Sequence, residues 1–444
     1  MRNSAMARLG IMGVLFVGLL IPLSMMHTVV SERAGRRSEA ASAISAEWGG
    51  PQTLAGPVLT IPYRLAWKDA NGNVRERTQK LFVLPEALSV TGHIEHSTRK
   101  RGLFEVVVYT ARLKVNGRFL RPDLSGIRPE PSHVDWDNAS VDVGVTDPRG
   151  IARRLTMRWA GREAGFVPGV TPNGLFSTGL RVPVGALPES LNAIPFEFEI
   201  DLNGTPDLRI LPAGDETQVT LASTWPHPSF TGAPLPRERS IGPSGFTASW
   251  NIPYFGRGYP PRWTSDEMIP NERRGEVYAS AIGVTLMRPV DIYQQTERAV
   301  KYAALFIVLT FVIAFLWEVT GGVLVHPVQY LFVGFAMCVF YLLLLSLAEH
   351  IQFDGAYGAA AVATVTLLAW YWSWVLNGLK QGTVMGGVLV GLYGFLYLLL
   401  RLEDYALLAG SIGLFLMLAA VMFLTRRVQW YDLRLGTREN APAR

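Results

Sequence analysis

Residues 328–348, VQYLFVGFAMCVFYLLLLSLA, contain no charged side chain and decide the fold class of this chain. A helix needs about 20 apolar residues to cross a membrane, and its backbone polar groups must pair within the segment. Other stretches that meet this condition are residues 9–30, 302–319, 355–376, 382–400 and 405–424. The sequence therefore predicts an α-helical membrane protein with six spans, one N-terminal signal anchor and a C-terminal bundle of five helices.

Charge is concentrated between the anchor and the bundle. Of the 77 charged residues, 61 lie in residues 31–301, and 25 of the 28 prolines lie in the same segment. The segment has 32 Lys and Arg against 29 Asp and Glu, so it is nearly neutral and we expect no nucleic-acid partner. The single cysteine, Cys338, excludes a disulfide framework and a cysteine-based zinc site.

These changes in composition divide the chain into five predicted parts. Residues 1–30 form the transmembrane signal anchor, and residues 31–50 continue it as a helical extension. Residues 51–298 form a β-rich domain, residues 299–425 form the five-helix bundle, and residues 426–444 form a basic tail.

Basic residues predict the orientation of the spans. Six spans place both termini on one side, and Lys380 with the arginine-rich tail marks that side as cytoplasmic. Arg33, Arg36 and Arg37 oppose this orientation, but they begin a long domain, where the charge bias has less influence. We therefore expect the β-rich domain on the other side of the membrane.

Alternation along residues 51–298 predicts strands. Residues 196–202, FEFEIDL, alternate between apolar and acidic side chains, as in a half-buried strand. Residues 219–222, 246–252 and 281–287 are further strand candidates. Asn-Gly pairs favour hairpin turns, and this segment contains Asn71-Gly72, Asn116-Gly117 and Asn203-Gly204. These patterns predict a large antiparallel, sandwich-like β domain.

Ionisable side chains in a membrane bundle are functional candidates by default. A polar cluster is predicted at the extracytoplasmic helix ends, formed by Glu349, His350, Asp354, Arg401, Glu403 and Asp404. Arg401 is its only arginine, so we expect it to pair with at least one of the carboxylates. Glu318 and His326 lie near the opposite, cytoplasmic end and are too distant to join this cluster.

No catalytic motif is found, so we predict no catalytic residues, no metal and no cofactor. His93 and His96 could form a metal pair, although exposed histidines flanking a turn are the simpler interpretation. His133, Asp135 and Asp137 would share one face of a strand, which makes a metal site geometrically feasible.

Four segments resemble the CreD family of inner-membrane proteins. They are SERAGRRSEAASAISAEWGGPQTLAGPVLTIPY at 31–63, PVDIYQQTERAVKYAALFIVLTF at 289–311, HPVQYLFVGFAMCVFYLLLLSLAEHIQF at 326–353 and LYGFLYLLLRLEDYALLAGSIGLFLMLAAVMFLTRRVQWY at 392–431. The resemblance implies a bacterial inner-membrane location with a periplasmic domain. It also implies a role in envelope integrity, colicin tolerance and the response to β-lactams under the CreBC two-component system. It carries no catalytic residue to this chain.

We therefore expect a protein that supports cell-envelope integrity by non-catalytic binding at the periplasmic face. The expected partner is membrane lipid, peptidoglycan or an envelope protein, and the oligomeric state stays open. One alternative is a transporter or channel accessory, which would need polar groups at the centre of the bundle. A second alternative is a membrane enzyme that acts on lipid or wall precursors through the polar cluster.

Overall fold

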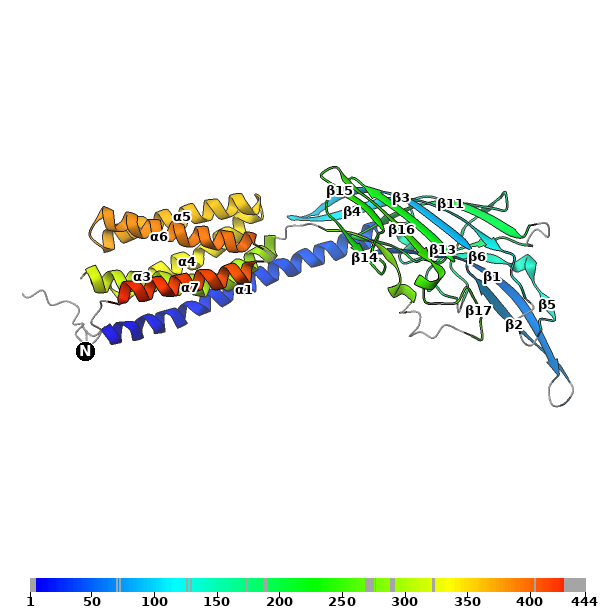
Figure 1. Ribbon diagram of the computed structural model, residues 1–444, viewed down its shortest axis with the longest axis horizontal. Coiled ribbons are helices and arrows are strands. Elements are labelled where there is room, and N and C mark those ends of the chain that lie inside the picture. Colours follow the sequence, from blue (N-terminus) through cyan, green and yellow to red (C-terminus); the bar gives the residue numbers. More distant parts are fainter. Residues whose placement is uncertain are drawn as a thin grey trace, which may run out of the picture. The chain divides into compact units, whose positions relative to one another are not determined.

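The computed structural model describes residues 5–68, 71, 73–124, 127, 130–172, 174–186, 191–267, 275, 277–287, 292–321, 324–402 and 405–426. The chain divides into two compact units (Figure 1). A membrane unit comprises Met1–Arg37 with Val290–Arg444, and a β domain comprises Ser38–Pro289. Each unit is described by itself below.

Among the described residues, six helices are long and apolar enough to cross a membrane, as predicted. They are α1 (Ala5–Trp48), α3 (Ile292–Gly321), α4 (Pro327–Ala348), α5 (Phe353–Val375), α6 (Leu379–Arg401) and α7 (Ala406–Thr425). Helix α1 includes the predicted extension beyond the anchor. Helix α3 begins at Ile292, before the predicted start of the bundle at residue 299, because a polar first segment continues the helix beyond its apolar stretch.

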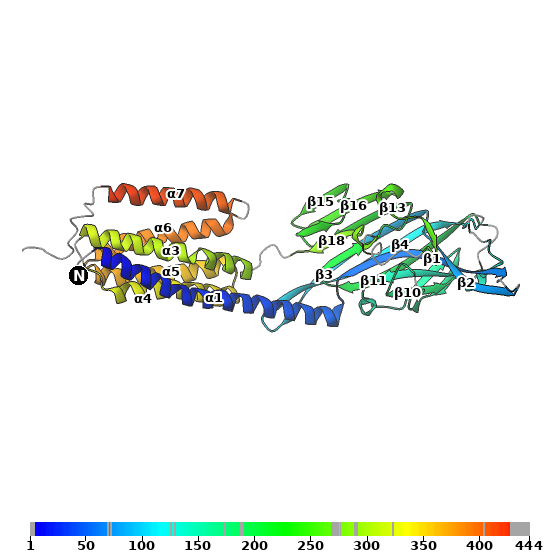
Figure 2. The same cartoon turned by 90° about the horizontal axis from the view of Figure 1, so that it is seen from below.

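The membrane unit is held together by close contacts between helices. Leu19 of α1 is fully buried against Gly334 of α4, where an added Cβ would lie 2.1 Å from the Leu19 Cδ1 atom. Phe340 of α4 packs edge-on against Tyr357 of α5 and Tyr393 of α6, and the Tyr357 hydroxyl donates to the Tyr393 carbonyl at 2.6 Å. Helix α7 lies at the edge of the bundle beside α6 (Figure 2).

The described strands of the β domain form two sheets. One has ten strands, in the order β14-β18-β12-β1-β6-β10-β9, with β2 and β5 also on β1 and β17 on β2. Its strands are β1 (Gln52–Lys68), β2 (Val74–Val83), β5 (His133–Val134), β6 (Ser140–Val145), β9 (Val167–Pro168), β10 (Gly179–Pro183), β12 (Asp207–Ile210), β14 (Pro228–Thr231), β17 (Arg262–Thr264) and β18 (Ile282–Leu286).

The other sheet has eight described strands, in the order β15-β16-β13-β3-β4-β11-β7-β8. They are β3 (Ala87–Arg101), β4 (Phe104–Leu120), β7 (Thr156–Trp159), β8 (Arg162–Gly165), β11 (Ala193–Gly204), β13 (Glu216–Ser223), β15 (Glu238–Gly242) and β16 (Gly245–Pro253). Short 3-10 helices lie at η1 (Trp136–Asn138), η2 (Pro148–Gly150) and η3 (Tyr254–Gly256). Most pairs are antiparallel as predicted, but β1 pairs with β12 and β3 with β13 in parallel.

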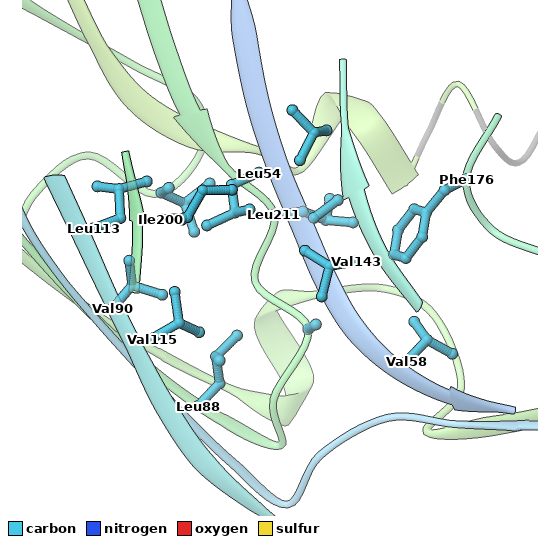
Figure 3. Close-up of a cluster of buried hydrophobic side chains, with 14 of the residues drawn as sticks. Leu54, Val58, Leu88, Val90, Leu113, Val115, Val143, Phe176, Ile200 and Leu211 are labelled. Carbon is cyan, nitrogen blue, oxygen red and sulfur yellow. The ribbon is translucent and has the colours of Figure 1, made fainter. Parts of the chain in front are cut away.

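One hydrophobic core joins the two sheets (Figure 3). The ten-stranded sheet contributes Leu54 and Val143, while the eight-stranded sheet contributes Leu88, Leu113 and Ile200. All five are almost inaccessible to solvent. Burial of apolar surface from both sheets is therefore the main stabilising contribution to this domain.

The structure corrects two of the three hairpin predictions. Strands β1 and β2 do form a hairpin around Asn71, with Lys68 opposite Val74. Gly117 instead lies inside β4. A glycine fits this position because an added Cβ would lie 2.1 Å from the Ala87 carbonyl oxygen and 2.7 Å from the Phe196 ring.

Asn203-Gly204 is the second corrected position. Both residues still pair with β4, opposite Thr110 and Tyr109. The chain then crosses to the other sheet, where β12 joins β1 and β18, so β11 and β12 are not partners. Gly204 is required at this crossing because a Cβ would lie 2.3 Å from the Tyr109 hydroxyl oxygen.

Candidate functional site

The predicted polar cluster contains a pair that joins α5 to α6. The Arg401 Nη2 atom donates to the Asp354 carboxylate, as expected for Arg401. The Tyr397 hydroxyl donates to Asp354 Oδ1 at 3.2 Å and accepts from Arg401 Nε at 3.1 Å. About half of each charged side chain is exposed, so the pair is a surface contact between two helix ends.

Glu349 belongs to a different contact. Its side chain is only 8% exposed and lies 3.7 Å from Arg33 Nε of α1, while the Tyr293 hydroxyl of α3 donates to Glu349 Oε1 at 3.1 Å. His350 is exposed at the end of the same turn. Glu349 and Asp354 therefore engage different arginines and tyrosines. Glu403 and Asp404 lie outside the described residues.

The histidine candidates do not converge either. His93 and His96 lie within strand β3 rather than beside a turn, and their odd spacing places them on opposite faces. His96 instead contacts the Thr224 hydroxyl at 3.2 Å and packs edge-on against Trp225.

The run from His133 to Asp137 does not form one strand face. Strand β5 ends at Val134, and the Asp135 carboxylate caps the following 3-10 helix by accepting from the backbone and side chain of Asn138. Within the part of the chain that the structure describes, no three His, Cys, Asp or Glu side chains are grouped to hold a metal ion.

A buried ionic site at the opposite end of the bundle was not predicted from the sequence. Glu318 near the end of α3 is 1% exposed and forms an ion pair with Arg8 of α1. The Tyr330 hydroxyl of α4 donates to Glu318 Oε2 at 3.0 Å, and the Val325 backbone donates to Oε1 at 3.4 Å. A cavity of about 460 Å³ opens beside this site, and His326 also lines it. We refer to it as the bundle-end cavity.

The sequence did contain a signal for this site. Glu318 is one of seven charged residues in residues 302–425, and Arg8 is one of two in residues 1–30. Both were predicted at the same side of the membrane. Two isolated opposite charges at one depth favour a pair, because a lone charge in an apolar segment is costly.

A second cavity, of about 580 Å³, lies on the outer face of the eight-stranded sheet. We refer to it as the outer groove. Strand register places four hydrogen-bonding side chains in one row across it: Gln218 of β13, Ser89 of β3, Asn116 of β4 and Glu197 of β11. The row provides hydrogen-bonding groups from four neighbouring strands.

Charged side chains flank this row. Lys114 Nζ lies 2.6 Å from Glu197, and Arg158 lies 3.2 Å from the same carboxylate. The hydrogen bond from Lys114 lowers the pKa of Glu197, and the same bond raises the pKa of Lys114. Arg118 on the other side of the row pairs with Glu86 at 2.5 Å. The groove therefore has a mixed lining with cationic groups at its margins.

These features define a multi-pass membrane protein that carries a large two-sheet β domain. The profile of the family described as "Inner membrane protein CreD" matches residues 4–431. The chain is also 34% identical to the Inner membrane protein CreD of Escherichia coli (strain K12), over 94% of this chain and 92% of that protein. The chain belongs to the CreD family of inner membrane proteins, which confirms the family resemblance of its sequence.

Proposed function

We propose that this CreD-family protein supports cell-envelope integrity as a non-catalytic binding protein, and that its outer groove binds peptidoglycan. The proposal includes an orientation, with both termini in the cytoplasm and the β domain in the periplasm. Peptidoglycan is the polar polymer of that compartment, whereas lipid would favour an apolar groove.

The row of Gln218, Ser89, Asn116 and Glu197 is the observation that carries this proposal. Neighbouring strands are about 4.8 Å apart, so the row offers donors and acceptors at regular intervals across four strands. Glycan hydroxyls and peptide amides need such alternating groups, and a well-paired polar group avoids a desolvation penalty. Arg118 and Arg158 each contact one glutamate through a single nitrogen, and their remaining N–H groups would bind the carboxylates of the stem peptides.

The orientation is supported by the basic residues at the ends of the spans. Arg8 near the start of α1, Lys380 at the start of α6 and Arg426 after α7 all belong to the ends that six alternating spans place together. Basic residues are enriched on the cytoplasmic side. The β domain, between α1 and α3 in the sequence, would then be periplasmic.

Co-sedimentation of the full-length protein, in nanodiscs, with purified peptidoglycan sacculi tests the binding proposal. The double variant Asn116→Ala/Gln218→Ala should weaken binding by about tenfold or more, because two hydrogen-bonding groups are removed. The matched control is His93→Ala, on the same strand face but outside the groove. Equal binding by wild type and double variant, or no sedimentation of the wild type, would refute the proposal.

A reporter fusion tests the orientation separately. A reporter inserted beside Asn71, in the exposed β1–β2 hairpin, should report periplasm, while a fusion after Arg444 should report cytoplasm. Asn203-Gly204 is unsuitable for insertion, because this segment crosses between the two sheets. Both reporters on the same side would overturn the proposed orientation.

A further inference from the structure

We infer that the bundle-end cavity binds the headgroup of a zwitterionic aminophospholipid, with its phosphate on Arg8. This inference concerns the membrane unit and does not depend on peptidoglycan binding by the β domain. The cavity holds one fixed cation and one fixed anion beside apolar side chains.

Glu318 acts as the residue that positions Arg8. Its two carboxylate oxygens are already engaged by Arg8, the Tyr330 hydroxyl and the Val325 backbone. An arginine guanidinium has five N–H donors in a fixed plane. Among the described residues, Glu318 engages the Nη1 atom of Arg8, which leaves other donors of the guanidinium for a ligand. Such a planar set of donors recognises carboxylate and phosphate groups, and phosphate is the one that membrane phospholipids carry.

His326 supplies a second donor at the cavity. Its Nδ1 atom accepts from the Val328 backbone at 3.3 Å as part of the cap of α4. A ring whose Nδ1 accepts carries its proton on Nε2 when neutral, and that N–H can donate to a phosphate oxygen. The cavity therefore combines the guanidinium of Arg8 with a second N–H donor.

The apolar lining indicates a lipid rather than a free phosphate. Ile11 of α1 and Leu324 before α4 line the cavity and are 43% and 50% exposed. Ile11 belongs to a membrane-spanning helix, in which an exposed apolar side chain faces lipid, and Leu324 lies in the connection between α3 and α4. Acyl chains could thus leave the cavity along these two side chains while the headgroup stays at the ionic site.

The balance of charge indicates a zwitterionic headgroup. Arg8 and Glu318 cancel each other, so an anionic lipid would leave the site with a net negative charge in a region of low dielectric constant. A phosphate with an attached ammonium group keeps the occupied site neutral.

Native mass spectrometry of the delipidated full chain, titrated with phosphatidylethanolamine or phosphatidylglycerol, tests this inference. The wild type should prefer phosphatidylethanolamine by about fivefold or more. Arg8→Gln should reduce that affinity by about tenfold. Glu318→Gln should reverse the preference toward phosphatidylglycerol, because the site becomes net positive. Leu324→Trp, which narrows the cavity without changing charge, should also lower occupancy.

Arg401→Gln is the matched control, because it removes one arginine from the predicted opposite end of the bundle and should leave the lipid preference unchanged. The inference is wrong if the wild type shows no preference, if Arg8→Gln and Leu324→Trp bind like the wild type, or if inorganic phosphate displaces the lipid adduct. Sacculus binding should be unaffected in all these variants, so the failure of one proposal is distinguishable from that of the other.

Discussion

The membrane unit and the β domain place their apolar side chains in opposite ways. In the β domain the apolar side chains form one closed core, and most ion pairs, such as Lys114 with Glu197, lie on the outside. In the membrane unit large apolar side chains such as Leu407 and Phe415 are exposed, while Glu318 is buried. One chain therefore relies on the burial of apolar side chains in a closed core in one unit and on the close fit of helices in the other.

The largest effect should come from the core of the β domain. Phe119 is fully buried between Trp159 and Phe196, so Phe119→Ala should lower the free energy of unfolding by about 3–5 kcal/mol. Thermal unfolding of the full chain, followed by near-UV circular dichroism, measures this loss. The neighbouring Leu120 is 49% exposed, and Leu120→Ala should change stability by less than about 0.5 kcal/mol. Equal effects of the two variants would contradict a closed core.

A smaller effect is expected from helix fit in the membrane unit. Gly334→Val would press against Leu19 and should destabilise the contact between α1 and α4 by about 1–3 kcal/mol. Adding Leu19→Ala should restore part of the loss, because it frees space for the valine. Thermal stability in detergent measures both variants. If the double variant were no more stable than Gly334→Val alone, the result would contradict the claim that close helix fit at Leu19 and Gly334 stabilises the membrane unit.

The exposed pair at the other helix ends should matter less. Arg401→Ala should lower Tm by no more than about 3 °C, because an exposed ion pair contributes little. Arg401→Ala and Asp354→Asn together should have less than the summed effect, since both remove the same contact. Additive losses would show that the two residues act independently.

The smallest expected effect is a dependence of β-domain stability on pH. The hydrogen bond from Arg149 holds the pKa of Asp147 below its usual range, against the opposing effect of burial. The carboxylate therefore contributes stability above about pH 4, and this contribution is lost as pH falls through its folded pKa. Tm measured from about pH 6 to pH 3 should fall less steeply for Asp147→Asn than for the wild type. Identical slopes would exclude Asp147 as a source of the dependence.

Much of this architecture could be predicted from the sequence. Each span is a local run of apolar residues, and the alternation at residues 196–202 identified part of β11. That Arg401 pairs with a neighbouring carboxylate also followed from local reasoning, because a lone arginine near an apolar boundary needs a partner, but the sequence did not select Asp354 among the candidates.

Contacts between distant segments could not be predicted in the same way. An Asn-Gly pair indicates a hairpin only when the strands before and after it pair with each other, whereas Gly117 and Gly204 lie where neighbouring atoms leave no room for a Cβ. The pair of Arg8 and Glu318 joins residues about 310 positions apart, and no local period encodes such a contact. The outer groove depends on the register of four strands, which alternation alone does not fix.

The parallel pairing of β1 with β12 has a consequence for the time course of synthesis. Gln52 lies opposite Leu208, and Arg209 of β12 lies opposite Gly283 of β18. At about 5–20 residues per second, a ribosome needs roughly 8–30 s to advance from Gln52 to Leu208. The first residues of β1 must wait that long for β12, whereas β2 reaches the rest of the strand early, and pairings over such long separations form slowly. We expect the nascent β domain to need protection from aggregation until β18 has emerged.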